Sequence, residues 1–251
     1  MQQLLKTFII FVTFVTYSFA GEVFQYSTIT ALMEGVYDGD YPARELEDSS
    51  LIGLGTFNAL DGEMVIMDGL VYQVNVEGEV IPVSPDTKTP FAVAAVFEPK
   101  AEDKAEGVDC SLLLEKTAEL ARSRNALLAY SIEGVFEHVK TRSVPAQKKP
   151  YPRLVDAVAE QRFFEFNDVK GRMVGFRFPE YMDGVNVPGF HTHFLNEKRT
   201  GGGHLVDCTV KEAYISVMEA DVFTLIIPGS EDFGGYTSEG SEGELEAIEV
   251  R

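Results

Sequence analysis

Three of the four histidines in this 251-residue chain lie within a span of fourteen residues. They are His191, His193 and His204, and three consecutive glycines precede the last of them. In an extended strand, successive side chains point to opposite faces, so His191 and His193 point the same way while Thr192 points away. Bringing the third imidazole to the same place requires a second strand beside the first, which constrains the fold more than any other feature of the sequence.

A hairpin satisfies that requirement. With residues 196–203 as its loop, Leu195 is expected opposite His204, and residues 191, 193, 195, 204, 206 and 208 share one face. His204 then lies diagonally across from His193, at roughly 7 Å between backbone positions. Three imidazoles that leave one coordination position free are the ligand set of catalytic rather than structural zinc. The sequence therefore predicts a metal site on a strand pair in the C-terminal half.

Two other interpretations of the cluster stay open. Three polar residues can share a strand pair at the surface without binding metal. Cys208 would face His191 in the predicted register, which would suit a structural zinc site of cysteine and histidine. The only other cysteine is Cys110, and the two thiols can equally form a disulfide or stay free and buried.

The first twenty residues differ in character from the rest. Lys6 precedes an apolar run over residues 8–15, and Ser18-Phe19-Ala20 supplies the small residues of a cleavage site before Gly21. The run is too short to span a bilayer comfortably. We interpret residues 1–20 as a signal peptide, with an uncleaved anchor as the alternative, and residues 21–251 as one domain. The protein is then expected to be secreted or periplasmic, with no membrane association after cleavage.

The net charge of -19 argues against nucleic acid or an anionic membrane as a partner, because both require a basic surface. The segment over residues 140–153 has the opposite charge to this acidic background. It contains no Asp or Glu and carries five cationic residues, namely Lys140, Arg142, Lys148, Lys149 and Arg153. It is either the entry for an anionic substrate or a solvated basic loop stiffened by prolines.

Strand patterns dominate the chain. Apolar runs at 51–57, 63–67, 70–76 and 80–83, separated by Gly-containing turns, predict an antiparallel meander that a strand at 91–97 extends. Helices are expected at 28–33 with Ser27 as the cap, at 111–123 and at 153–162. Further strands are expected at 24–26, 127–132, 135–139, 163–166, 173–178, 190–195, 204–210, 214–218 and 222–227. The fold class is therefore α+β with mixed, largely antiparallel sheets, followed by an acidic tail at 229–251.

Four motifs in order resemble the alpha-acetolactate decarboxylase family over nearly all of residues 21–251. They are Phe24-Gln25-Tyr26-Ser27-Thr28, Gly55-Thr56-Phe57-Asn58-Ala59-Leu60-Asp61-Gly62-Glu63-Met64, Thr141-Arg142-Ser143-Val144-Pro145, and Gly189-Phe190-His191-Thr192-His193-Phe194-Leu195 with Gly202-Gly203-His204. The resemblance implies a Zn²⁺ enzyme, usually a homodimer, that converts 2-acetolactate, a small 2-hydroxy-3-oxo acid, to acetoin and carbon dioxide.

The resemblance also implies roles for individual residues. His191, His193 and His204 match the zinc ligands of the family. Arg142 matches its catalytic arginine, Glu63 its catalytic glutamate, and Thr56 the threonine of its Gly-Thr-Phe motif, which is expected to contact the substrate or to support residues that do. A second catalytic glutamate comes from the tail, where Glu249 is the first choice and Glu246 the second.

The implied reaction explains why these residue types are needed. Loss of carbon dioxide from a 2-hydroxy-3-oxo acid leaves negative charge on the former ketone oxygen as an enediolate, which a Lewis acid stabilises. Arg142 would orient the substrate and stabilise negative charge. Glu63 would handle the hydroxyl proton or deliver a proton to carbon. His138 has no partner at metal spacing and is assigned no role.

Two other functions compete with this one. A cupin-type metal enzyme would use His191, His193 and Glu197, which fit an H-x-H-x(3)-E pattern. A non-catalytic exported module that binds metal or ligand would need only the histidines. It would leave the motifs around Thr56, Glu63 and Arg142 without a purpose.

Overall fold

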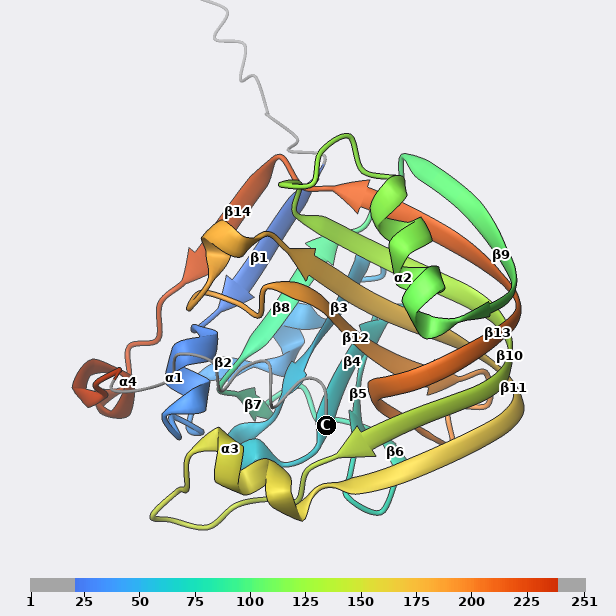
Figure 1. The fold of residues 1–251 in the computed structure, drawn as a ribbon. Helices are drawn as coiled ribbons and strands as arrows, with labels where there is room; N and C mark the ends of the chain where they lie inside the picture. The colour runs from blue at the N-terminus through green and yellow to red at the C-terminus, as the bar shows by residue number, and fades with distance from the viewer. Residues whose placement is uncertain (1–20, 239–251) are drawn as a thin grey trace, which may run out of the picture.

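The computed structural model describes residues 21–238, and two β-sheets packed against each other dominate it (Figure 1). The first sheet has seven strands in the order β14-β1-β8-β3-β4-β5-β6. Neighbours are antiparallel except β1 and β14, which are parallel. The strands are β1 (Glu22–Tyr26), β3 (Leu51–Thr56), β4 (Glu63–Met67), β5 (Leu70–Val74), β6 (Val80–Pro82), β8 (Ala92–Val96) and β14 (Val222–Ile226).

The second sheet has five longer, antiparallel strands in the order β10-β11-β12-β13-β9, and β10 pairs with β13 as well as with β11. This extra pairing curls the sheet back on itself. Its strands are β9 (Ala101–Asp109), β10 (Leu128–Ser143), β11 (Arg162–Phe178), β12 (Gly189–Asn196) and β13 (Gly202–Glu219). The short strands β2 (Tyr41–Pro42) and β7 (Lys88–Thr89) pair separately.

The helices are short. They are α1 (Ile29–Met33), α2 (Cys110–Glu119), α3 (Leu154–Ala157) and α4 (Glu231–Gly235), with 3₁₀ turns η1 (Ala43–Leu46), η2 (Asn58–Leu60), η3 (Val158–Glu160) and η4 (Glu180–Met182). The cap of α1 is Thr28, whose hydroxyl accepts a hydrogen bond from the backbone N–H of Ala31, so the prediction of Ser27 was wrong. No helix among residues 21–238 has the length and apolarity needed to cross a membrane.

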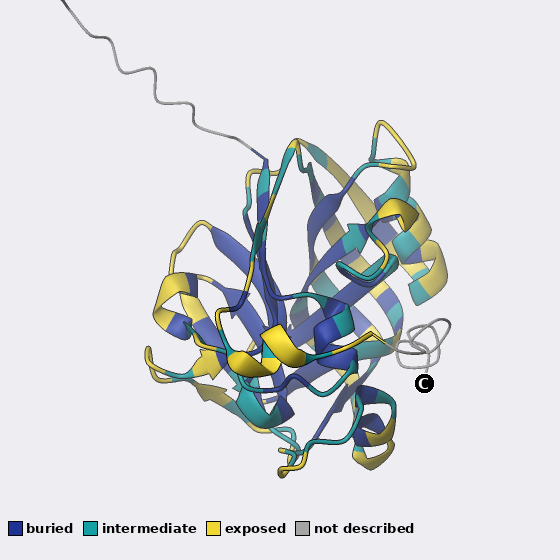
Figure 2. Cartoon of the chain, turned by 90° about the vertical axis from the view of Figure 1, so that its left-hand side faces the viewer, coloured by how far each residue is buried: buried dark blue, intermediate teal, exposed yellow. Residues whose placement is uncertain are grey.

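Apolar side chains fill the space between the two sheets. The first sheet contributes Leu54, Val65 and Val93, and the second contributes Val174 and Phe176. The other face of the second sheet packs against α2. Figure 2 shows buried residues along the strands inside the molecule and exposed residues on the loops and helices around them. A smaller cluster joins α1 and α3 at one end, beside the histidines.

The predicted α+β class and the antiparallel meander are confirmed. Asp68-Gly69 forms the tight turn that was predicted, with positive φ at both residues. The predicted helix at 153–162 is shorter and consists of α3 followed by η3. The proposed signal peptide at 1–20 and the last part of the tail, 239–251, lie outside the described residues.

The two cysteines form a disulfide. Cys110 and Cys208 bond with their Cα atoms 4.9 Å apart, which links the start of α2 to β13. This excludes Cys208 as a thiolate ligand, so the alternative of a structural cysteine and histidine zinc site was wrong. Val139, which pairs with Cys208, and Cys208 itself belong to the core beneath α2 and not to the face that carries the histidines.

Candidate metal centre

The three histidines converge as the strand alternation predicts. His191 and His193 lie on β12 and His204 on β13, all three are buried, and their nearest ring nitrogens lie within 4.8 Å of one another. The predicted register was off by two residues. The hairpin loop is shorter than expected, so His193 lies directly opposite His204 and Leu195 opposite Gly202. A shift of two residues preserves the face on which each side chain lies, which is why the histidines still meet.

Glycine is required where β13 begins. Gly203 has a φ of +129°, and a Cβ atom there would lie 2.5 Å from the carbonyl oxygen of Arg142. Only glycine adopts such a backbone angle readily and allows so close an approach. This approach lets Arg142 on β10 pair with His204 on β13, so the arginine lies beside the histidine group.

The ring nitrogens are arranged for a cation. The Nδ1 atom of His193 lies 2.7 Å from the carbonyl oxygen of Met64 on β4. A carbonyl can only accept, so Nδ1 carries the proton and donates it. The Nε2 atom of His193 is then left with a lone pair, and it faces Nε2 of His191 at 3.2 Å. A bound cation would relieve the crowding of such nitrogens in a buried site, so this donor set fits a metal ion.

All three imidazoles are kept neutral by their surroundings. Burial and the nearby charge of Arg142 lower the pKa of His191 to about 3. Burial is also the main reason why the pKa values of His193 and His204 lie well below the usual value, and the neighbouring histidines and Arg142 add to it. Neutral imidazole is the form that binds metal.

The other predicted residues surround this group. Glu63, on β4, is buried, and its Oε2 lies 3.4 Å from Nε2 of His193. It is therefore not the exposed hairpin charge that its turn position alone would suggest. The hydroxyl of Thr56 on β3 donates to the carbonyl oxygen of Gly62 at 2.7 Å, which ties β3 to the loop before Glu63. Arg142 is buried on the same side.

These side chains line a narrow cavity of about 50 Å³. One part of its wall is polar and consists of Thr56, Glu63, Arg142 and the three histidines. Another part is apolar, with Ile29, Leu32, Leu60, Phe91, Val144, Leu154 and Val158. This apolar wall was not predicted from the sequence, where its residues look like ordinary core positions of separate segments.

Of the basic segment, only Arg142 lines the cavity. Lys149 pairs with Asp38, and Arg153 pairs with Glu34 at 3.0 Å. Lys140 lies over the ring of Phe163, 4.8 Å from its centroid. Lys140 and Arg142 therefore belong to β10, Lys149 and Arg153 are paired in the stretch that follows it, and one arginine of the segment reaches the site.

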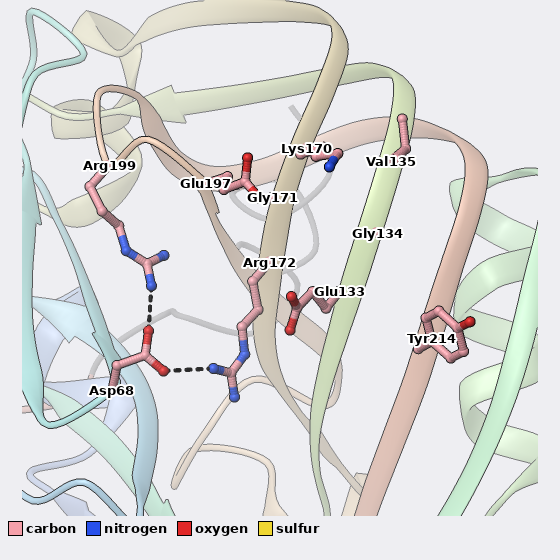
Figure 3. Close-up of a pocket in the computed structure, with 10 residues that line it drawn as sticks. All are labelled: Asp68, Glu133, Gly134, Val135, Lys170, Gly171, Arg172, Glu197, Arg199 and Tyr214. Carbon is pink, nitrogen blue, oxygen red and sulfur yellow. Dashed lines mark hydrogen bonds and ion pairs between the residues drawn. The ribbon is translucent and has the colours of Figure 1, made fainter.

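A larger hollow, of about 650 Å³, lies elsewhere on the second sheet (Figure 3). At one end of it, the carboxylate of Asp68 lies between the guanidinium groups of Arg172 and Arg199 and pairs with both. Glu197 lines this hollow and not the histidine cavity. Among the described residues, the candidate metal ligands are the three histidines without Glu197, so the cupin-type arrangement does not form.

Comparison with known proteins identifies the family of the chain. The family model for alpha-acetolactate decarboxylase matches residues 23–237. The chain belongs to the alpha-acetolactate decarboxylase family. The alpha-acetolactate decarboxylase of Methylococcus capsulatus is 43% identical over 208 residues, which cover 82% of this chain and 80% of that protein. The one of Methanosarcina mazei is 41% identical over 237 residues, covering 90% and 78%.

Solved structures of the family have the same fold. The crystal structure of alpha-acetolactate decarboxylase from Bacillus subtilis strain 168 matches with a TM-score of 0.87 and 33% identity, covering 91% of this chain and 99% of that one. A Staphylococcus aureus protein described as similar to alpha-acetolactate decarboxylase matches with a TM-score of 0.85 and 30% identity, covering 90% and 98%. The two candidate tail residues of this family member, Glu246 and Glu249, lie outside the described residues.

Proposed function

We propose that this family member is a carboxy-lyase that converts 2-acetolactate to acetoin and carbon dioxide, with Zn²⁺ held by His191, His193 and His204. The observation that carries the proposal is the arrangement of the cavity. Three neutral imidazoles converge at a polar wall that also contains Arg142 and Glu63. When bound, the zinc ion would supply Lewis acidity at the oxygen on which negative charge develops.

Arg142 is the residue suited to the substrate carboxylate. Its guanidinium is permanently charged, and it donates hydrogen bonds in a rigid fork. It is buried, so its interaction with an anion is stronger than it would be in water. As the bond between C2 and the carboxylate breaks, the electron pair moves toward the ketone, and carbon dioxide leaves. Arg142 orients the carboxylate for that step and stabilises the remaining negative charge.

Glu63 is the candidate for proton transfer. The product needs one proton at C2, where the carboxylate was attached, and the reaction consumes one proton overall. The Glu63 carboxyl lies beside His193 on the polar wall, so it is within reach of a molecule bound there. General acid–base catalysis by such a group typically contributes about 10²- to 10⁴-fold in rate. Thr56, whose hydroxyl bonds to Gly62, supports the position of the segment that carries Glu63.

The apolar wall has a complementary role. The substrate has two methyl groups, and side chains such as Leu32, Phe91 and Leu154 offer them an apolar surface. A wall of this kind also excludes water from the reacting carbon, which strengthens the electrostatic interactions of Arg142 with the carboxylate.

Acetoin formation from racemic 2-acetolactate by the purified, zinc-loaded protein tests the function, with His193→Ala as the comparison and the spontaneous reaction as the baseline. We expect rapid acetoin release from the wild type, little above baseline from the variant, and one zinc ion per wild-type chain by elemental analysis. Wild-type activity no higher than the spontaneous rate at full metal loading would refute the proposal.

We further propose that the tail contributes Glu249 to the reaction, with Glu246 as the alternative. Comparing Glu249→Gln with Glu246→Gln tests this, because only the substitution of the catalytic residue should lower kcat strongly. The likeness of the chain to its family supports this proposal. It also supports our proposal that the protein is a homodimer, which size-exclusion chromatography with light scattering tests by measuring the molar mass.

We also propose that residues 1–20 direct export and are removed before Gly21. The Cys110–Cys208 disulfide supports this, because such bonds form and persist in oxidising compartments. Amino-terminal sequencing of the protein from the periplasm or medium checks it. Retention of the full chain in the cytoplasm would contradict it.

A further inference from the structure

A hydroxyl pair lies directly behind two of the metal-site histidines. Thr192 separates His191 from His193 on β12 and points to the opposite face of the sheet, and its hydroxyl hydrogen-bonds to the phenol of Tyr130. Tyr130 is fully buried on β10. Its phenol oxygen also lies 3.5 Å from the carbonyl oxygen of His191.

The contact spans three strands. Tyr130 pairs with Gly175 on β11, and Gly175 pairs in turn with Thr192 on β12, so the three residues form one row across the sheet. Because the middle residue has no side chain, the tyrosine ring crosses it and reaches the far strand. A Cβ atom on Gly175 would lie 2.3 Å from the phenol oxygen, so only glycine permits this arrangement.

Other contacts add to the hold on β12. Phe190 packs edge-on against the ring of Tyr130, with centroids 5.7 Å apart. On the opposite face of β12, His193 donates to the carbonyl oxygen of Met64. The segment 191–193 is therefore fixed from both of its faces.

We propose that Tyr130, acting through Thr192 across Gly175, is a positioning residue that sets the orientation of His191 and His193 toward the metal. The inference rests on the proposed metal site. It assigns a role to a residue that lines no part of the cavity. Partners of this kind, which orient ligands without touching the metal, typically change metal affinity about 10- to 100-fold when they are removed.

The test uses Tyr130→Phe and Thr192→Val, which each remove one hydroxyl with little change in shape, and Thr192→Ser, which keeps the hydroxyl. Tyr37→Phe is the matched control, because Tyr37 is a buried tyrosine away from β12 whose phenol oxygen has no hydrogen-bond partner among the described residues. The readouts are the Co²⁺ dissociation constant by chelator competition, the Co²⁺ absorption spectrum, and thermal melting of the metal-free proteins.

We expect the Co²⁺ dissociation constant to rise about tenfold or more in Tyr130→Phe and Thr192→Val, with an altered spectrum. The double variant should lose no more Co²⁺ affinity than either single variant, because both substitutions remove the same hydrogen bond. Thr192→Ser and Tyr37→Phe should match the wild type. Wild-type affinity and spectrum in both hydroxyl-removing variants, with only a lower melting temperature, would show that the pair merely packs the core. Failure of the wild type to bind Co²⁺ would instead overturn the metal centre itself.

Discussion

Removing the Cys110–Cys208 disulfide is expected to destabilise the protein strongly. The two cysteines are 98 residues apart in the sequence. Closing a loop of about 100 residues in the unfolded chain is worth about 4.7 kcal/mol at 25 °C in the chain-entropy description. Measured losses for native disulfides are about 2–5 kcal/mol. Because Cys208 is buried in the core beneath α2, replacing it by alanine also removes packing, so we expect a loss near the upper end.

Urea unfolding separates these two contributions. Three samples are compared: the oxidised wild type, the wild type kept reduced, and Cys110→Ala/Cys208→Ala. The reduced protein retains both sulfur atoms, so its loss reports the cross-link alone, and the double variant adds the lost packing. With a slope of about 2.5 kcal/mol per molar urea, a loss of about 4 kcal/mol lowers the midpoint by roughly 1.6 M. Equal stability of the oxidised and reduced wild type would refute the reasoning, because it would mean that the cross-link does not constrain the unfolded chain.

Four further outcomes are expected. Glu63→Gln should lower kcat about 10²- to 10⁴-fold while zinc content by elemental analysis stays unchanged; an equal loss of zinc would make Glu63 a ligand instead. Gly203→Ala should destabilise the fold by about 1–3 kcal/mol in urea unfolding, because alanine is strained at a φ of +129°; a neutral effect would contradict the close approach described. In metal-free protein, His191 is neutral when folded down to a pKa of about 3, whereas the unfolded chain protonates it near 6.5. The same holds for His193 and His204, whose pKa values burial also lowers, so the free energy of unfolding should be highest above about pH 6.5 and decline below it by about 1.4 kcal/mol per pH unit for each of the three imidazoles. Urea unfolding at pH 7.5 and 5.5 measures the sum; stability independent of pH would show exposed imidazoles. Asp68→Asn, at a half-exposed ion pair, should cost less than about 1 kcal/mol in the same assay and leave acetoin formation unchanged; a large loss of activity would give the larger hollow a catalytic role.

The convergence of the three histidines was predictable because it depends on strand alternation. His191 and His193 share a face in any register, so only the position of the second strand was uncertain. The error of two residues in the hairpin left His204 on the correct face. The register itself was not predictable, since it depends on how tightly the loop between Asn196 and Gly201 closes.

Strand lengths were underestimated for a different reason. One predicted strand ends at Ile132 and the next begins at Val135, but β10 runs unbroken from Leu128 to Ser143. Glu133 and Gly134, which separate the two predicted strands, pair regularly with Tyr214 and Ala213 of β13. A Cβ atom on Gly134 would lie 2.2 Å from the carbonyl oxygen of Glu212, so this glycine marks a close approach of two strands and not the end of one.

The apolar wall of the cavity was beyond prediction from local patterns. Ile29 and Leu32 on α1 meet Leu154 and Val158 more than a hundred residues later in the chain. Each looks like an ordinary core residue in its own segment. They line the cavity only because the sheets bring the two short helices together at one end, and this depends on long-range packing.

A bulge in β13 places His204 and Cys208 on opposite faces of the strand. In an unbroken β13, residues 204, 206 and 208 would share a face, and Cys208 would lie on the side of the histidines. The register with β10 instead shifts between Leu205 and Asp207, so Cys208 turns to the other face and bonds Cys110. A thiol left beside the imidazoles would have been a competing ligand that completes a closed site. The bulge thus leaves the three histidines without a neighbouring thiol and directs the cysteine to the face on which it cross-links the fold.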